Sequence, residues 1–120
     1  MADSLTFDKS KDFAIRIVNL CKYLRTDKRE FILSKQLLRS GTSIGANISE
    51  ALYGVSRKDF LAKAFISLKE CAETKYWLEL LFKTDYLSES EFNSIDRDCT
   101  ELLKLLTKIV KTTRQNDSDE

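Results

Sequence analysis

The chain has 120 residues, of which 42% are hydrophobic and 32% charged, so it is long enough to bury one hydrophobic core beneath a charged surface. It has no proline and only three glycines, which excludes a β-rich fold because such folds need a Gly or Pro turn about every ten residues. It also has no histidine, and its net charge is only +1. The sequence therefore predicts an all-helical protein that is not an enzyme and holds no metal or cofactor, and bulk charge gives no argument for nucleic-acid binding.

No segment predicts membrane insertion or export, so we expect a cytoplasmic protein. The longest stretch without a charged residue runs from Ser40 to Ser49, whereas a bilayer-spanning helix needs about 18 apolar residues. The N-terminus lacks the basic and apolar segments of a secretion signal. Cys21, Cys71 and Cys99 have no C-x-x-C spacing and lie among apolar neighbours, which favours reduced thiols in the core over a disulfide or a zinc site.

The first helix is predicted from about Asp8 or Ser10 to Arg25, because apolar residues recur there at steps of three and four. These residues are Phe13, Ile17, Leu20, Cys21 and Leu24. The segment 27–30 has the D-x-x-E form of a capping box and predicts the start of a second helix. That helix is expected to end near Tyr53, with Gly54 supplying a stop at positive φ.

The middle of the second helix is open to two interpretations. The ten residues from Ser40 to Ser49 are poor helix formers and cost roughly 5–6 kcal/mol relative to polyalanine, which favours a loop. A continuous helix is favoured by the single stripe formed by Leu33, Leu37, Gly41, Ile44, Ile48, Ala51 and Val55. We predict the continuous helix, with packing offsetting its low propensity and with Gly41 and Gly45 allowing a neighbouring helix to approach closely.

The third helix is predicted to be capped by residues 56–59 and to run to about Lys83. Residues 84–87 form a loop, and the S-x-x-E box at 88–91 opens the fourth helix. The fourth helix has an a/d pattern at Phe92, Ile95, Cys99, Leu102, Leu106 and Ile109. We therefore expect an N-terminal arm at 1–7, a helical domain at 8–113 and a disordered acidic tail at 114–120.

Four helices joined by short loops predict an antiparallel up-down-up-down four-helix bundle. The seams are mostly of a/d type, so crossing angles near 20° are expected.

The second helix carries an unusual stripe opposite its core-facing one, formed by Gln36, Arg39, Ser43, Asn47 and Glu50. One interpretation is an ordinary solvated face. The other is that the stripe packs against something, with Arg39 and Glu50 paired or hydrogen-bonded there.

The third helix is apolar on two sides. Its core side comprises Phe60, Leu61, Ala64, Leu68, Cys71, Leu78 and Phe82. Its other side carries Ala62, Ile66, Trp77 and Leu80, with Leu81 at the margin. An exposed Trp beside Ile and Leu is typical of a contact surface, so we expect the chain to self-associate. A mobile loop or tail that folds over these residues is the alternative.

Basic residues concentrate at the turn between the first two helices. Lys22, Arg25, Lys28 and Arg29 lie within eight residues, and Lys35 and Arg39 follow along the second helix. In a monomer this cluster is most simply a solvated helix end, whereas in a ring of identical subunits it would repeat as a basic surface for RNA or DNA. Tyr23 is the aromatic residue close to the cluster, so base stacking is not predicted.

Three segments, 39–51, 58–60 and 69–81, resemble a family of bacterial four-helix bundle proteins. The family includes products of intervening sequences in large-subunit (23S) ribosomal RNA genes and the accessory variability protein of diversity-generating retroelements. The resemblance covers about residues 7–111. It implies a cyclic homopentamer with an electropositive surface and, in the retroelement branch, binding of nucleic acid and a reverse transcriptase.

We therefore expect a homo-oligomeric accessory protein that binds RNA or DNA, or a ribonucleoprotein, and possesses no catalytic residues. Its partners are expected to be copies of itself and a reverse transcriptase or another protein. The expected oligomer interface comprises Arg39, Ser43, Asn47, Glu50, Ala62, Ile66, Glu73, Tyr76, Trp77 and Leu80. A protein-interaction scaffold without nucleic-acid binding is the main alternative, and a ligand-binding or catalytic bundle is a remote third.

Overall fold

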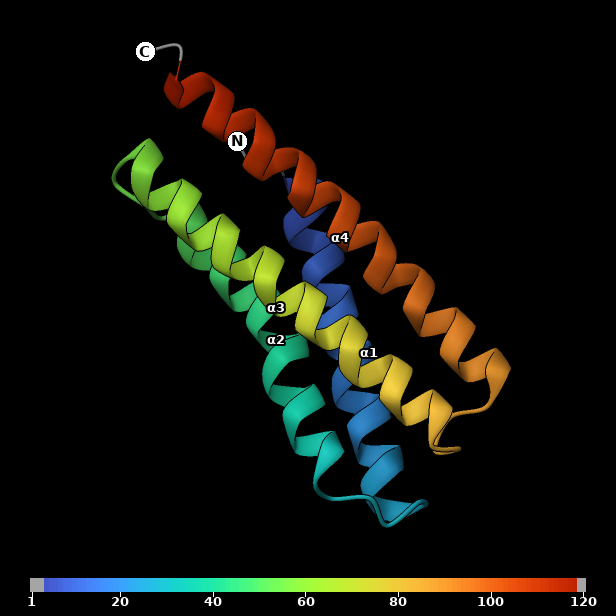
Figure 1. The fold of residues 1–120 in the computed structure, drawn as a ribbon. Coiled ribbons are helices and arrows are strands. Elements are labelled where there is room, and N and C mark those ends of the chain that lie inside the picture. Colours follow the sequence, from blue (N-terminus) through green and yellow to red (C-terminus); the bar gives the residue numbers. More distant parts are fainter. Residues whose placement is uncertain (1–3, 119–120) are drawn as a thin grey trace.

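A computed structural model describes residues 4–118, and within this range the chain forms four α-helices and no β-strand (Figure 1). The helices are α1 (Ser4–Thr26), α2 (Leu33–Leu52), α3 (Arg57–Lys83) and α4 (Glu89–Ser118). They pack side by side into a rod of 52 × 21 × 21 Å. The prediction of an all-helical fold with four helices is confirmed.

Each helix packs against its neighbours in the sequence, and α4 also contacts α1 (Figure 1). The contacts between α1 and α4 run in opposite directions along the two helices. Lys9 forms an ion pair with Glu101, whereas Arg16, two turns further along α1, bonds to Asp98 at 2.7 Å and to the Ser94 carbonyl at 3.2 Å. The same reversal relates α2 to α3 and α3 to α4 (Figure 1).

The second helix is continuous through its poor helix-forming segment, as predicted. Its hydroxyl and amide side chains bond within the helix, as in the 2.7 Å bond from Thr42 to the Leu38 carbonyl. Gly41 explains how close packing offsets the propensity cost. A Cβ atom at this position would lie 2.8 Å from Cγ2 of Ile17, so α1 and α2 approach here at a distance that only glycine permits.

The start of α2 differs from the prediction. The helix begins at Leu33, and residues 27–30 lie in the preceding turn. The backbone N–H groups at the start of α2 have no carbonyl partner within the helix. The carboxylate of Glu30 accepts hydrogen bonds from those of Ile32, Leu33 and Ser34 instead. Glu30 therefore takes the capping role that the sequence pattern gave to Asp27, because the chain makes a turn between the two residues.

The end of α2 also differs, since no glycine in residues 4–118 has a positive φ. The N–H of Gly54 bonds to the Ala51 carbonyl at 3.1 Å and continues the last turn without a left-handed residue. Val55, predicted on the core stripe, lies beyond the helix and is 95% exposed.

The two later caps are confirmed. Ser56 precedes α3, and its hydroxyl accepts a bond from the Asp59 nitrogen at 3.1 Å. At the start of α4, the Ser88 backbone nitrogen donates to the Glu91 carboxylate at 2.8 Å, and the Glu91 backbone nitrogen donates to the Ser88 hydroxyl at 3.1 Å. Helix α3 ends at Lys83, as expected.

The core lies along the bundle axis and draws on all four helices. Its fully buried large side chains include Phe13, Ile17, Leu24, Leu37, Ile44, Ile48, Leu78, Leu81, Leu102 and Leu106. Leu81, predicted at the margin of the second apolar side, is thus a core residue. The three cysteines are buried and free, as predicted, and the sulfur atoms of Cys71 and Cys99 lie 4.0 Å apart.

The helices extend beyond the predicted domain limits. Helix α1 begins at Ser4, within the expected N-terminal arm, and α4 continues to Ser118, within the expected tail. Residues 1–3 and 119–120, which the prediction assigned to the same arm and tail, lie outside the described residues.

Candidate functional surfaces

The residues predicted for the oligomer interface lie on two adjacent helices. Arg39 of α2 donates to Glu70 of α3 at 3.1 Å and forms an ion pair with Glu73, while Glu50 of α2 pairs with Lys63 of α3 at 3.1 Å. Arg39 and Glu50 are therefore each paired, but with α3 and not with each other. These bonds join the two predicted stripes, and we call the combined surface the α2–α3 face.

A charged and aromatic network organises the α2–α3 face. The indole nitrogen of Trp77 donates to Glu73 at 2.9 Å, so this carboxylate accepts from both Trp77 and Arg39. The bond from Trp77, aided by Arg39, lowers the pKa of Glu73 below its ordinary value, and the bond from Glu73 raises the pKa of Arg39. The two groups therefore remain charged over the neutral pH range.

The exposed residues of this face differ from the sequence expectation. Trp77 is half-buried against the main core, so it is not the exposed aromatic residue that the pattern suggested. Tyr76 takes that place: it is 58% exposed and packs edge-on to Trp77 at 5.0 Å. Ile66 is 41% exposed and Ala62 is exposed as well, whereas Leu80 is half-buried.

The small polar residues of the face bond within α2. The Ser43 hydroxyl donates to the Arg39 carbonyl at 2.6 Å, and the Asn47 amide donates to the Ser43 carbonyl at 2.8 Å. Both side chains are half-buried. These side chains and that of Ala62 are short, so they leave room for another helix to approach the α2–α3 face.

The basic cluster predicted for nucleic acid divides into two places. Lys22, Arg25, Lys28, Arg29 and Lys35 are all exposed around the α1–α2 turn, and the ammonium group of Lys28 lies 5.9 Å from the ring centre of Tyr23. Arg39 belongs instead to the α2–α3 face, where Glu70 and Glu73 neutralise its charge. We call the first five residues the basic turn.

Two exposed apolar residues beside the basic turn were not predicted from the sequence. Phe31 is 50% exposed and Ile32 is 77% exposed, directly after Arg29 and Glu30. The pattern gave no warning, because an apolar pair next to a helix start is ordinarily a core-facing pair.

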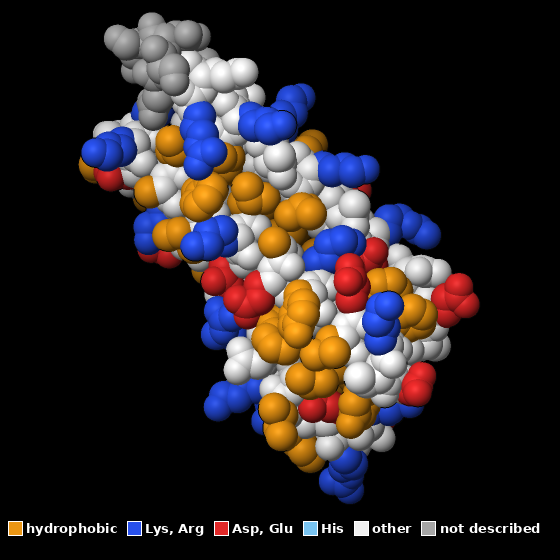
Figure 2. All heavy atoms as spheres, in the orientation of Figure 1, with side chains coloured by type: hydrophobic (Ala, Val, Ile, Leu, Met, Phe, Trp, Pro, Cys, Tyr) orange, Lys and Arg blue, Asp and Glu red, His pale blue; other side chains and the backbone are white. Residues whose placement is uncertain are grey.

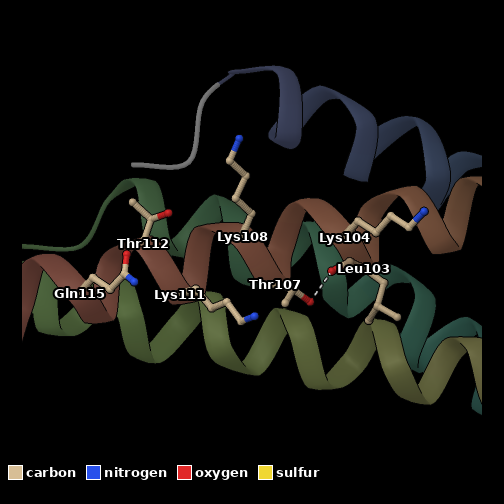
Figure 3. Close-up of a pocket in the computed structure, with 7 residues that line it drawn as sticks. All are labelled: Leu103, Lys104, Thr107, Lys108, Lys111, Thr112 and Gln115. Carbon is tan, nitrogen blue, oxygen red and sulfur yellow. Dashed lines mark hydrogen bonds between the residues drawn. The ribbon is translucent and has the colours of Figure 1, made fainter.

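A second basic surface, also missed by the sequence analysis, follows the C-terminal half of α4. Residues 102–115 contain four basic side chains and no acidic one, whereas residues 84–101 contain six acidic side chains and one basic. Lys104, Lys108 and Lys111 line an open groove of about 470 Å³, and the side chains of Lys108 and Lys111 diverge from each other along the helix (Figure 3). Figure 2 shows these basic side chains along α4 beside a strip of apolar ones.

The described residues contain no group of three or more His, Cys, Asp or Glu side chains arranged to hold a metal ion. Among the four helices of residues 4–118, none combines the length and apolar character needed to cross a bilayer.

Comparison with models of protein families shows which family this chain belongs to. The model of the family described as "23S rRNA-intervening sequence protein" matches residues 2–108. The chain belongs to this family. The resemblance inferred from the three sequence segments is thereby confirmed.

A solved structure is also similar to this chain. It is a protein of unknown function from the S23 ribosomal protein family of Bacteroides thetaiotaomicron, with 56% sequence identity to this chain and a TM-score of 0.87. The match covers 88% of this chain and 98% of the other. No curated protein matches this 120-residue chain.

Proposed function

We propose that this protein of the 23S rRNA-intervening sequence family is an antiparallel four-helix bundle that assembles as a cyclic homo-oligomer, most simply a pentamer. In the cytoplasm it acts as a non-enzymatic accessory protein that binds nucleic acid or a ribonucleoprotein. The α2–α3 face carries the assembly, and the basic turn carries the nucleic acid.

The observation that carries the assembly is the exposed apolar group on α3. Ile66 and Tyr76 keep 41% and 58% of their surface exposed on the outer side of a helix whose inner side already fills the core. They flank the Arg39–Glu73–Trp77 network, which fixes polar groups beside them. A rigid apolar patch with an ordered polar rim has the composition of a protein interface.

The assembly is tested by size-exclusion chromatography with light scattering. We expect the chain to elute as an oligomer of its 13.9 kDa subunit, and Ile66→Glu to yield smaller species that remain helical by circular dichroism. Ile15→Glu is the matched control, because Ile15 of α1 is 54% exposed but lies away from the α2–α3 face. A monomeric wild type, or equal effects of the two variants, would contradict the proposal.

Nucleic-acid binding is supported by the five exposed cations of the basic turn, which repeat in every subunit of a ring. Labelled structured RNA and duplex DNA are titrated at two salt concentrations, and affinity is expected to fall as salt rises because phosphate contacts release counterions. Lys28→Glu with Arg29→Glu should weaken binding strongly. Lys104→Glu with Lys108→Glu changes the net charge equally on α4 and should weaken it less.

The alternative is a protein-interaction scaffold. It is favoured by the net charge of only +1 and by the neutralisation of Arg39. An oligomer that binds neither RNA nor DNA near physiological salt would support the scaffold and exclude the accessory role.

A further inference from the structure

The α1–α2 turn is held rigidly by one buried carboxylate. Oε1 of Glu30 accepts from the Ser34 nitrogen at 2.7 Å, and Oε2 accepts from the nitrogens of Leu33 and Ile32 at 2.9 and 3.2 Å. The Ser34 hydroxyl donates back to the Glu30 carbonyl at 3.0 Å, and Glu30 is only 7% exposed. The backbone on either side of Phe31 is therefore fixed by several bonds at once.

This rigid turn holds Phe31 and Ile32 outward. The core beneath it is complete without them, since Leu24 and Leu37 are fully buried at the adjoining ends of α1 and α2. Phe31, which is 50% exposed, is thus available to a ligand at little entropic cost, because the turn is already ordered before binding.

The side chains around Phe31 determine the charge of that ligand. Five exposed cations belong to the basic turn, and its two acids are already engaged: Glu30 caps α2, and Asp27 accepts from the Thr26 hydroxyl at 2.8 Å. Arg29 has a φ of 55°, a left-handed backbone that reverses the chain between the α1 end and Glu30. The turn therefore combines an outward aromatic ring with a basic rim.

We infer that the basic turn binds single-stranded nucleic acid, with an unpaired base stacked on Phe31 and the flanking phosphates held by the surrounding Lys and Arg side chains. This inference rests on the proposed nucleic-acid function and specifies its substrate. Aromatic rings within basic surfaces bind unpaired bases because every base has a free face. A duplex hides those faces in its own stack, and a membrane would require a larger apolar surface than two side chains.

The test compares Phe31→Ala with Phe31→Tyr and Phe65→Ala in the full chain. Phe65 is the matched control, because it is 37% exposed and has Arg114 and Lys69 near its ring at 5.0 and 5.9 Å, but it lies on α3. The probes are a labelled RNA of about 12 adenine nucleotides, which fits a typical single-strand site, and a blunt-ended RNA duplex of the same length, which has no unpaired base. Vesicles containing phosphatidylserine provide the membrane comparison, and light scattering gives the oligomer mass.

We expect Phe31→Ala to weaken binding of the adenine RNA about tenfold, to leave duplex binding nearly unchanged, and to leave the helical signal and mass intact. Phe31→Tyr should retain wild-type affinity, and Phe65→Ala should have no effect.

Equal loss for both RNAs, unchanged affinity, a fall in oligomer mass, or a loss confined to vesicle binding would overturn the inference. If Lys28→Glu with Arg29→Glu weakens binding while Phe31→Ala does not, stacking fails and the proposed function survives. If the wild type binds neither of these RNAs and also fails to bind the structured RNA and duplex DNA of the earlier titration, both fail.

Discussion

Replacing Gly41 by alanine tests the close contact between α1 and α2. The new Cβ atom would lie 2.8 and 2.9 Å from Cγ2 and Cγ1 of Ile17, a fully buried β-branched side chain whose rotamer cannot change easily. Overpacking of this kind costs about 1–3 kcal/mol, and replacing a helical glycine by alanine returns about 1 kcal/mol. Because both contacts fall on stiff branches, we expect a net loss of about 1–2 kcal/mol in the free energy of unfolding.

Gly45 provides the matched control on the same helix. A Cβ atom there would lie 3.2 Å from the Ser10 hydroxyl oxygen, so the Ser10 side chain would need to move by only a few tenths of an ångström to reach ordinary contact. Gly45→Ala should therefore be neutral or stabilise the protein slightly. Urea unfolding followed by circular dichroism measures both variants. The reasoning is refuted if Gly41→Ala is as stable as Gly45→Ala or more stable than the wild type.

A double-mutant cycle assigns the cost to one contact. Ile17→Ala alone should destabilise the protein by about 2–5 kcal/mol, because it leaves a cavity in the core. In the Gly41→Ala background the same change also relieves the clash, so its cost should fall by about 1 kcal/mol or more. Additive effects would show that the strain of Gly41→Ala does not arise at Ile17.

Three further predictions concern other buried or bonded groups. Glu30→Ala leaves three backbone N–H groups uncapped and should cost about 1–2 kcal/mol, measured by urea unfolding. The bond from Trp77 lowers the pKa of Glu73 below its ordinary value of 4.5. The stability that this carboxylate contributes is therefore present above pH 4.5 and is lost as the pH falls below 4.5. Fluorescence of the single tryptophan should titrate with a midpoint under pH 4.5. Burial raises the pKa of Cys21 to about 11, and the hydrogen bond with the Cys71 thiol, together with burial, raises the pKa of Cys99. Mass spectrometry should therefore detect iodoacetamide adducts on these two cysteines only after unfolding.

Local sequence signals determined the four helices. The recurrence of apolar residues at three and four positions set which sides of the helices enter the core, and the boxes at Ser56 and Ser88 fixed two helix starts within a residue. These signals succeed because a helix turn and its cap are made by residues within four positions of each other. The same periodicity carried α2 through its glycines, where packing against Ile17 outweighs propensity.

The tertiary structure alone decided which residues perform the tasks that several could perform. The D-x-x-E pattern predicted that Asp27 caps α2, whereas the path of the turn places Glu30 at the free backbone nitrogens. The pattern predicted Trp77 as the exposed aromatic residue, whereas Tyr76 takes that place and the Trp77 indole bonds to Glu73.

Exposure is the property that the sequence could not supply. Phe31 follows a pattern that ordinarily faces the core, yet the bonds of Glu30 to the next backbone nitrogens hold it outward. The pairing of Arg39 with Glu73 likewise joins residues 34 positions apart. Helix propensity and periodicity are local quantities, whereas the direction of a side chain in a turn and the partner of a long cation depend on where other helices lie.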